Sequence, residues 1–134
     1  MLRKSLRRRL SMNSNLISKE PIFLVIGKVQ EGTKRGRALG FPTANLACPS
    51  AVPPGIYAGE AMWHNKKYAA ALYKEEKREV IEAHLLDFSG SLYGELLTLA
   101  AYKKMREPEV FKTHKELTEA IARDIEAIQK CLQE

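Results

Sequence analysis

Residues 36–45 read Gly-Arg-Ala-Leu-Gly-Phe-Pro-Thr-Ala-Asn, and this stretch is the most informative part of the chain for both fold and chemistry. It is a basic, glycine-punctuated loop that leads into an extended segment, because Pro42 disfavours helical geometry at Phe41. In an extended segment Thr43 and Asn45 point the same way. Arginine and backbone N–H groups suit phosphate, and hydroxyl and amide oxygens suit Mg²⁺. The stretch indicates a nucleotide–metal site; the alternative is a turn in which both side chains cap the backbone.

The segments around this loop have the composition of short strands. Five apolar or β-branched runs are separated by turn residues, at 22–29, 55–62, 68–73, 79–87 and 96–103. Residues 30–54 are rich in Gly, Pro, Ser and basic residues and predict a long loop. Residues 113–133 change to helical spacing, and Thr113 with Glu116 predicts a capping box. The pattern predicts a small antiparallel barrel or sandwich with one amphipathic helix packed on it.

The charge is concentrated at the N-terminus. The chain has 134 residues and a net charge of +6, which fits one domain. Residues 1–10 contain five Arg or Lys and no acid, so the remainder carries only +1. We therefore divide the chain into a basic tail or linker at 1–20 and a domain at 21–134. Because a folded basic face is lacking, no nucleic-acid partner is expected. The tail fits a solvated leader, which we favour, or an organellar transit peptide.

Cysteine usage and hydropathy bear on the compartment. Cys48 and Cys131 belong to no CxxC or Cys/His ligand pattern, which is typical of a reduced environment. No apolar run approaches the length that spans a bilayer. We expect a cytoplasmic protein that acts as a monomer on small molecules without a membrane partner.

Residues 80–87 read Val-Ile-Glu-Ala-His-Leu-Leu-Asp and contain the best candidate for a general base. Strand alternation places Glu82 and His84 on one face and the apolar residues between them on the other. A carboxylate on a rigid strand can accept the proton of a hydroxyl group. The alternative is a solvent-facing strand surface, with His84 in a structural role.

Taken in order, these segments resemble the riboflavin kinase (flavokinase) family over about residues 22–132. The matching segments are Gly27–Val29, residues 36–46, Pro54–Ala58, Glu82–Phe88, Leu92–Gly94 and Met105–Arg106. The resemblance implies a mainly β fold, a six-stranded antiparallel Greek-key barrel with a C-terminal helix. It implies transfer of the γ-phosphate of ATP to the 5′-hydroxyl of riboflavin, which yields FMN and ADP and depends on Mg²⁺.

The resemblance also implies roles for individual residues. Thr43 and Asn45 match the family's metal- and nucleotide-binding pair, and Glu82 matches its catalytic base. Three further positions, Gly32, Gly36 and Arg37, fall in its nucleotide-binding loop. Two more, Arg106 and Phe111, fall in the stretch that flanks the flavin. Without the resemblance, Arg106 is equally well a surface charge that precedes a helix.

The chain departs from the family pattern in two places. The family carries a loop with Gly, Asn, Pro and Thr before the catalytic strand, whereas this chain has the short Lys74–Arg78 turn. The departure predicts a missing or rebuilt wall of the site and leaves open a flavin- or nucleotide-binding barrel with impaired catalysis. Many bacterial relatives also carry an adenylyltransferase module, for which this chain has no room. We therefore expect a monofunctional kinase.

Overall fold

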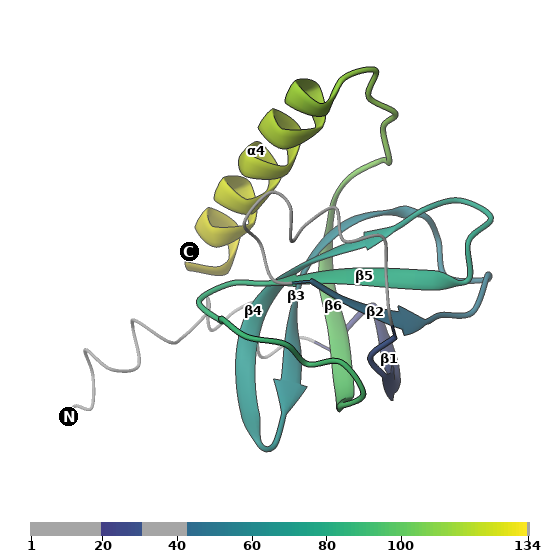
Figure 1. Cartoon of the computed structure of the whole chain (residues 1–134), viewed down its shortest axis with the longest axis vertical. Coiled ribbons are helices and arrows are strands. Elements are labelled where there is room, and N and C mark those ends of the chain that lie inside the picture. The colour runs from purple at the N-terminus through teal and green to yellow at the C-terminus, as the bar shows by residue number, and fades with distance from the viewer. Residues whose placement is uncertain (1–19, 31–42, 134) are drawn as a thin grey trace.

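A computed structural model of the chain describes residues 20–30 and 43–133. They form six strands and one helix (Figure 1). The strands are β1 (Phe23–Lys28), β2 (Thr43–Ala47), β3 (Gly55–Trp63), β4 (Lys66–Lys74), β5 (Val80–Leu85) and β6 (Leu96–Arg106), and the helix is α4 (His114–Gln133). The predicted mainly β architecture with a C-terminal helix is confirmed.

The strands form one antiparallel sheet that curls into a nearly closed barrel. Their order is β1-β6-β3-β4-β5-β2, so that β3, β4 and β5 follow one another as hairpins and β6 returns beside β3. That return is the Greek-key connection. The two edge strands approach each other where the backbone N–H of Gln30 donates to the carbonyl oxygen of Asn45 at 2.7 Å.

The position of β2 corrects the expected loop at 30–54. Residues Thr43–Ala47 are a strand that pairs along its whole length with β5. With two alanines, a threonine and an asparagine in five residues, the segment has little strand character of its own. Its geometry comes from the ladder with β5 and from the burial of Ala44 and Leu46 in the barrel. Residues 31–42 lie outside the described part of the chain.

The barrel interior is filled by apolar side chains from all six strands. Among the fully buried ones are Leu46, Leu72, Ile81, Leu97 and Leu99. At Gly59 the backbones of β3 and β6 come unusually close, next to a register shift between Ala58 and Gly59. A Cβ at this position would lie 2.1 Å from the carbonyl oxygen of Ala100. Only glycine fits at this close approach of the two strands without displacing one of them.

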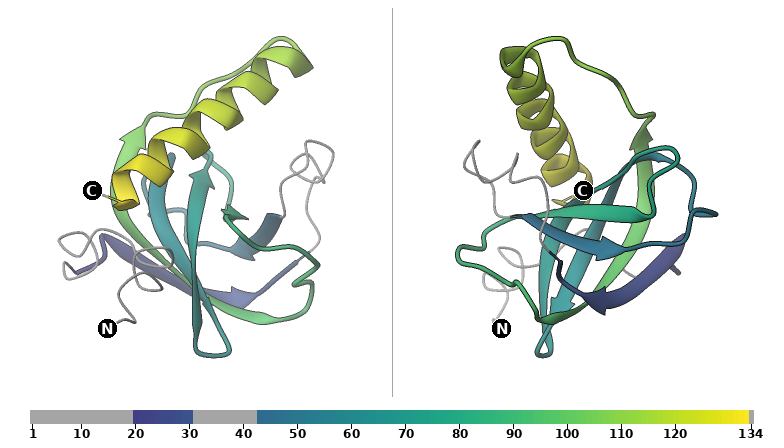
Figure 2. Two further views of the ribbon diagram at one scale, coloured as in Figure 1. Left: turned by 90° about the vertical axis from the view of Figure 1, so that its left-hand side faces the viewer. Right: turned by 45° about the vertical axis from the view of Figure 1, so that its right-hand side comes forward.

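Helix α4 packs on the outer face of β3 and β4 (Figure 2). Its apolar stripe includes Ile121, Ile125 and Ile128, and small strand residues such as Ala58 and Ala71 let it approach the sheet. The helix begins one residue later than predicted, because Thr113 is its cap: the Thr113 hydroxyl accepts from the N–H of Glu116 at 3.1 Å. The Glu116 carboxylate accepts from the N–H of Lys112, one residue before the cap, rather than from the N–H of Thr113 that a capping box uses. The Thr113 half of the predicted box is thus confirmed, and the return bond is displaced by one residue.

Candidate active site

The β2–β5 ladder brings the three central candidate residues together. Asn45 lies directly opposite Glu82, and Thr43 lies opposite His84. Residues directly opposite each other in an antiparallel pair project from the same face of the sheet. Thr43, Asn45 and Glu82, which are up to 39 positions apart in sequence, therefore share one outer surface of the barrel.

Glu82 and His84 are enclosed rather than solvent-facing, in contrast to the surface alternative. Their side chains are 12% and 2% exposed, and His84 Nε2 lies 3.7 Å from Glu82 Oε1. On the other side of β5, Tyr73 of β4 lies opposite Glu82, and its ring centroid is 4.7 Å from that of His84. The carboxylate thus lies on the middle strand of three, between Asn45 and Tyr73.

A cavity of about 390 Å³ opens on the Tyr73 side of Glu82. Strand residues Ile56, Tyr73, Glu82 and His84 form its floor, and α4 forms one wall. The segment between β6 and α4 lines it with residues 108–113, which include Phe111. Its size is that of a small-molecule site, and its lining is mixed apolar and polar. Thr43 and Asn45 are not part of this lining, so Glu82 lies at the boundary between the cavity and the β2 surface.

The short Lys74–Arg78 turn forms one end of the cavity, through Lys74, Glu75 and Arg78. The Lys74 side chain is buried, and its Nζ donates to the carbonyl oxygen of Glu75 at 2.9 Å. Arg78 Nη1 lies 3.4 Å from Glu75 Oε1. In the structure, the segment at which the sequence departs from the family pattern is thus a short charged turn at the end of the cavity.

Arg106 lines the cavity, but its guanidinium is engaged within the protein. Its Nε and Nη2 donate to Asp124 Oδ1 and Oδ2, both at 2.8 Å. The hydrogen bonds to Asp124 raise the pKa of Arg106. The Tyr73 hydroxyl donates to Asp124 Oδ2 at 3.4 Å, and burial followed by the Asp124 charge raises the pKa of Tyr73 well above its usual range. At neutral pH the Tyr73 side chain is therefore a neutral phenol beside the Arg106–Asp124 ion pair.

The donor set on β2 fits a magnesium ion. A hydroxyl and an amide oxygen on one face are hard ligands, and Mg²⁺ is commonly bound through few protein ligands together with water and substrate phosphates. Among the described residues, no group of three His, Cys, Asp or Glu side chains is placed to hold a metal. A cation here would thus be held by Thr43, Asn45 and oxygens that a phosphate ligand brings. The predicted loop residues Gly32, Gly36 and Arg37 lie outside the described part of the chain.

Two residues of the site were not predicted from sequence, Tyr73 and Asp124. Asp124 had a detectable signal, because it lies on the buried side of an otherwise apolar helix stripe, between Ile121 and Ile125. A carboxylate in such a position requires a buried partner. Tyr73 carried no such signal, since a tyrosine at the end of a strand is ordinary.

The sequence of the chain matches a known protein family. The family model described as Flavokinase, riboflavin kinase, matches residues 20–132. The chain belongs to the riboflavin kinase family. A bifunctional riboflavin kinase/FMN adenylyltransferase from Buchnera aphidicola is 34% identical to it over 119 residues. The match covers 81% of this chain and 38% of that relative, so the chain spans well under half the length of the relative.

Solved structures agree with the barrel. A Streptococcus pneumoniae protein described as a macrolide-efflux protein superposes with a TM-score of 0.72 at 23% identity, covering 92% of this chain and 45% of that one. Riboflavin kinase from Trypanosoma brucei superposes with a TM-score of 0.62 at 24% identity, covering 87% and 83%. At these identities the superpositions show a shared fold. No helix in the described ranges has both the length and the apolar character needed to cross a membrane.

Proposed function

We propose that this member of the riboflavin kinase family transfers the γ-phosphate of ATP to the 5′-hydroxyl of riboflavin and yields FMN and ADP. The observation that carries the proposal is the position of Glu82, which has Asn45 on one side and the cavity on the other. Phosphoryl transfer needs two substrates held in line and a base at the attacking hydroxyl. A carboxylate on the middle strand of three meets that requirement.

Each surface beside Glu82 is assigned one substrate. The β2 surface, with Thr43 and Asn45, takes the phosphates together with Mg²⁺, which neutralises charge on the transferring group when it is bound. Gly32, Gly36 and Arg37, which lie outside the described residues, are assigned to nucleotide binding on the family resemblance alone. The cavity takes the flavin, whose ring lies toward Phe111 and the apolar wall of α4, while its ribityl chain leads to Glu82. Arg106 belongs to the flavin side because it lines the cavity.

The chemistry at the boundary follows from the enclosure of Glu82. Its backbone is paired on both sides, and its Oε1 lies 3.7 Å from His84 Nε2. As the ribityl oxygen attacks phosphorus, Glu82 accepts the hydroxyl proton and the bond to ADP breaks. The neutral Tyr73 phenol opposite Glu82 adds no negative charge to repel the phosphates.

The test is an assay with riboflavin and ATP, with and without Mg²⁺, in which FMN is separated from riboflavin by chromatography. We expect FMN and ADP in equal amounts only when Mg²⁺ is present. The short Lys74–Arg78 turn motivates the second candidate, a binding module with impaired catalysis. Quenching of flavin fluorescence without ADP release would favour that module and reject the kinase.

A further inference from the structure

The Arg106 guanidinium connects three separate segments at the edge of the cavity. From the end of β6 it donates two hydrogen bonds to Asp124 of α4. Its Nη1 donates to the carbonyl oxygen of Glu107 at 2.9 Å and lies 3.6 Å from Glu109 Oε1. Glu107 and Glu109 belong to the segment that runs from β6 to α4 and lines the cavity with residues 108–113. One side chain thus holds both the helix and this segment.

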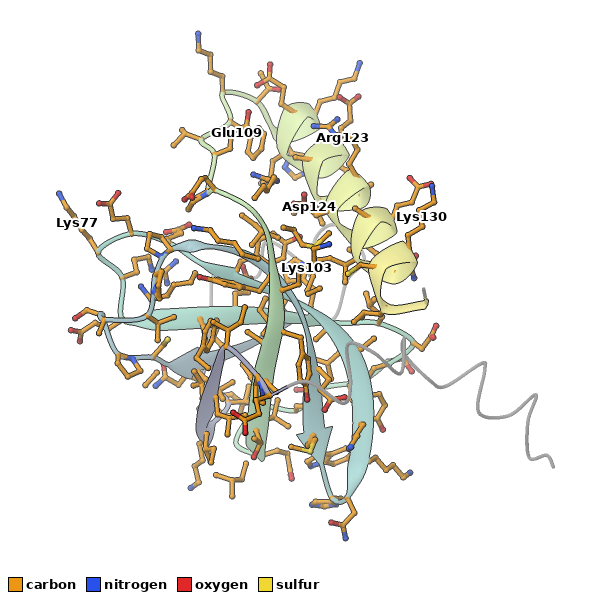
Figure 3. All side chains as sticks on the ribbon, turned by 180° about the vertical axis from the view of Figure 1, so that it is seen from behind. Lys77, Lys103, Glu109, Arg123, Asp124 and Lys130 are labelled. Atoms are coloured by element: carbon orange, nitrogen blue, oxygen red, sulfur yellow. The ribbon has the colours of Figure 1, made fainter. Side chains whose placement is uncertain are left out.

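Asp124 is the fixed end of this connection. Its side chain is 9% exposed, whereas that of Arg106 is 28% exposed. It lies on the side of α4 toward the strands, while its neighbour Arg123 is exposed to solvent (Figure 3). Besides the fork from Arg106 it accepts the Tyr73 hydroxyl, and Tyr73 lies opposite Glu82. The carboxylate therefore ties α4 to β6 and also to the strand beside the proposed base.

The geometry leaves Arg106 little capacity for a ligand. A two-point fork between guanidinium and carboxylate is directional, and removing either partner from a largely buried pair leaves a charge without compensation. A flavin that took the Nε proton, or the Nη2 proton that is directed at Asp124, would have to break a bond to Asp124. Of the five N–H donors of a guanidinium, one on Nη1 and one on Nη2 are left, and Nη1 already donates to Glu107 and lies near Glu109. Arg106 therefore shapes the cavity more readily than it binds what enters.

We propose that Asp124 is a positioning residue of this site. Through Arg106 and Tyr73 it sets the distance from α4 and the 107–113 segment to Glu82, and Arg106 acts on the flavin through Asp124 rather than by direct contact. This inference rests on the proposed kinase function for its kinetic consequences. Its structural part, the fixing of α4 at the cavity, stands apart from any activity.

A double-mutant cycle separates the two possible roles of Arg106. The variants are Arg106→Lys, which keeps the charge but loses the fork, Asp124→Asn, and the two combined. We expect each single variant to lower kcat/KM for riboflavin by about 10- to 100-fold, as loss of alignment does. KM for ATP should stay within about twofold, because the β2 surface is not altered, whereas general unfolding would affect both substrates.

The combined variant gives the decisive value. If Arg106 acts through Asp124, Arg106→Lys costs almost nothing further once Asp124→Asn is present. Losses that multiply in the combined variant would mean that Arg106 contacts the flavin itself, and would overturn the proposal. Arg123→Lys and Glu126→Gln, on the exposed side of α4, are the matched controls and should retain wild-type values.

Hydrogen exchange tests the structural part without any substrate. In Asp124→Asn we expect amides at 117–124 to exchange about tenfold faster, while amides of β3 and β6 keep their protection. Unchanged exchange in α4 would overturn the positioning role. Faster exchange in a protein whose wild type forms no FMN would reject the kinase function and leave the link between α4 and the barrel standing.

Discussion

Asn45 and Glu82 are direct partners across the β2–β5 ladder, and the carboxylate has the cavity on its other side. A strand at the edge of the sheet thus presents its polar side chains next to the proposed base. In an antiparallel pair this relation is fixed by register, since a slip of one residue would turn Asn45 into the barrel. The pairing, rather than either side chain alone, defines where the two substrates would meet.

Replacing Glu82 by Gln tests the proposed base. Glutamine keeps the size of the side chain but cannot accept the hydroxyl proton, so we expect kcat to fall by about 10²- to 10⁴-fold. Riboflavin binding, followed by quenching of flavin fluorescence, should change little because the cavity is preserved. Glu79→Gln, in the exposed turn before β5, is the control. Equal turnover by the Glu82 variant and wild type would remove Glu82 from the mechanism.

Thr43 offers a matched pair for the proposed magnesium ligand. Thr43→Val removes the hydroxyl with little change of shape, whereas Thr43→Ser retains it. We expect the Mg²⁺ concentration for half-maximal FMN formation to rise about tenfold or more in the valine variant, an effect typical of losing a group that supports a metal. The serine variant should stay near wild type. Identical Mg²⁺ titrations for the two variants would assign Thr43 a purely structural role.

Substitutions at Gly59 and Gly27 test the close approach of β3 and β6. A Cβ at Gly59 would lie 2.1 Å from the Ala100 carbonyl oxygen, and at Gly27 the nearest atom would be 3.9 Å away. We expect Gly59→Ala to lower the free energy of unfolding by about 3 kcal/mol or more, because a backbone must shift. Gly27→Ala should change it by less than about 1 kcal/mol, in the stabilising direction. Urea denaturation measures the free energy of unfolding of both variants. Similar losses of stability in the two would contradict a close approach of β3 and β6 at Gly59.

Half-buried Tyr102 and buried Glu60 form a pair away from the cavity, in which the Tyr102 hydroxyl donates to Glu60 Oε1 at 3.0 Å. Burial, together with the charge of Glu60 and the hydrogen bond to it, raises the pKa of Tyr102 from 10.0 to about 12. At neutral pH, Tyr102→Phe should cost about 1–3 kcal/mol of unfolding free energy, because the buried Glu60 carboxylate loses a hydrogen-bond donor.

The same pair predicts a pH dependence. Between pH 10 and 12 the unfolded chain releases the Tyr102 proton while the folded chain still holds it, so the folded state binds more protons and stability falls as pH rises. Tyr102→Phe should flatten this fall, whereas Tyr93→Phe, at an exposed position, should not. Urea midpoints measured from pH 9 to 12 compare the variants; parallel curves for wild type and Tyr102→Phe would refute the assignment.

The sequence predicted what depends on local pattern. Alternation along residues 80–87 placed Glu82 and His84 on one face, and helical spacing after Thr113 located α4. It missed β2, because a strand made largely of small and polar residues exists only through its partner. The family resemblance assigned Arg106 to the flavin side, which stays a prediction. Asp124 had a signal as a carboxylate within an apolar helix stripe, but its pairing with Arg106 could not be predicted, since a contact between residues 18 positions apart depends on how the helix docks. Long-range pairing accounts for both omissions.

The middle position of β5 has a consequence for divergence within this fold. Ladders on both flanks hold Glu82, whereas the cavity is bounded at one end by the Lys74–Arg78 turn, which belongs to no strand beyond Lys74. Insertions or exchanges in that turn would change which molecules fit the cavity while the Glu82 carboxylate keeps its position. Descendants of such a barrel can therefore acquire new selectivity at the rim and inherit an unaltered strand surface around Glu82.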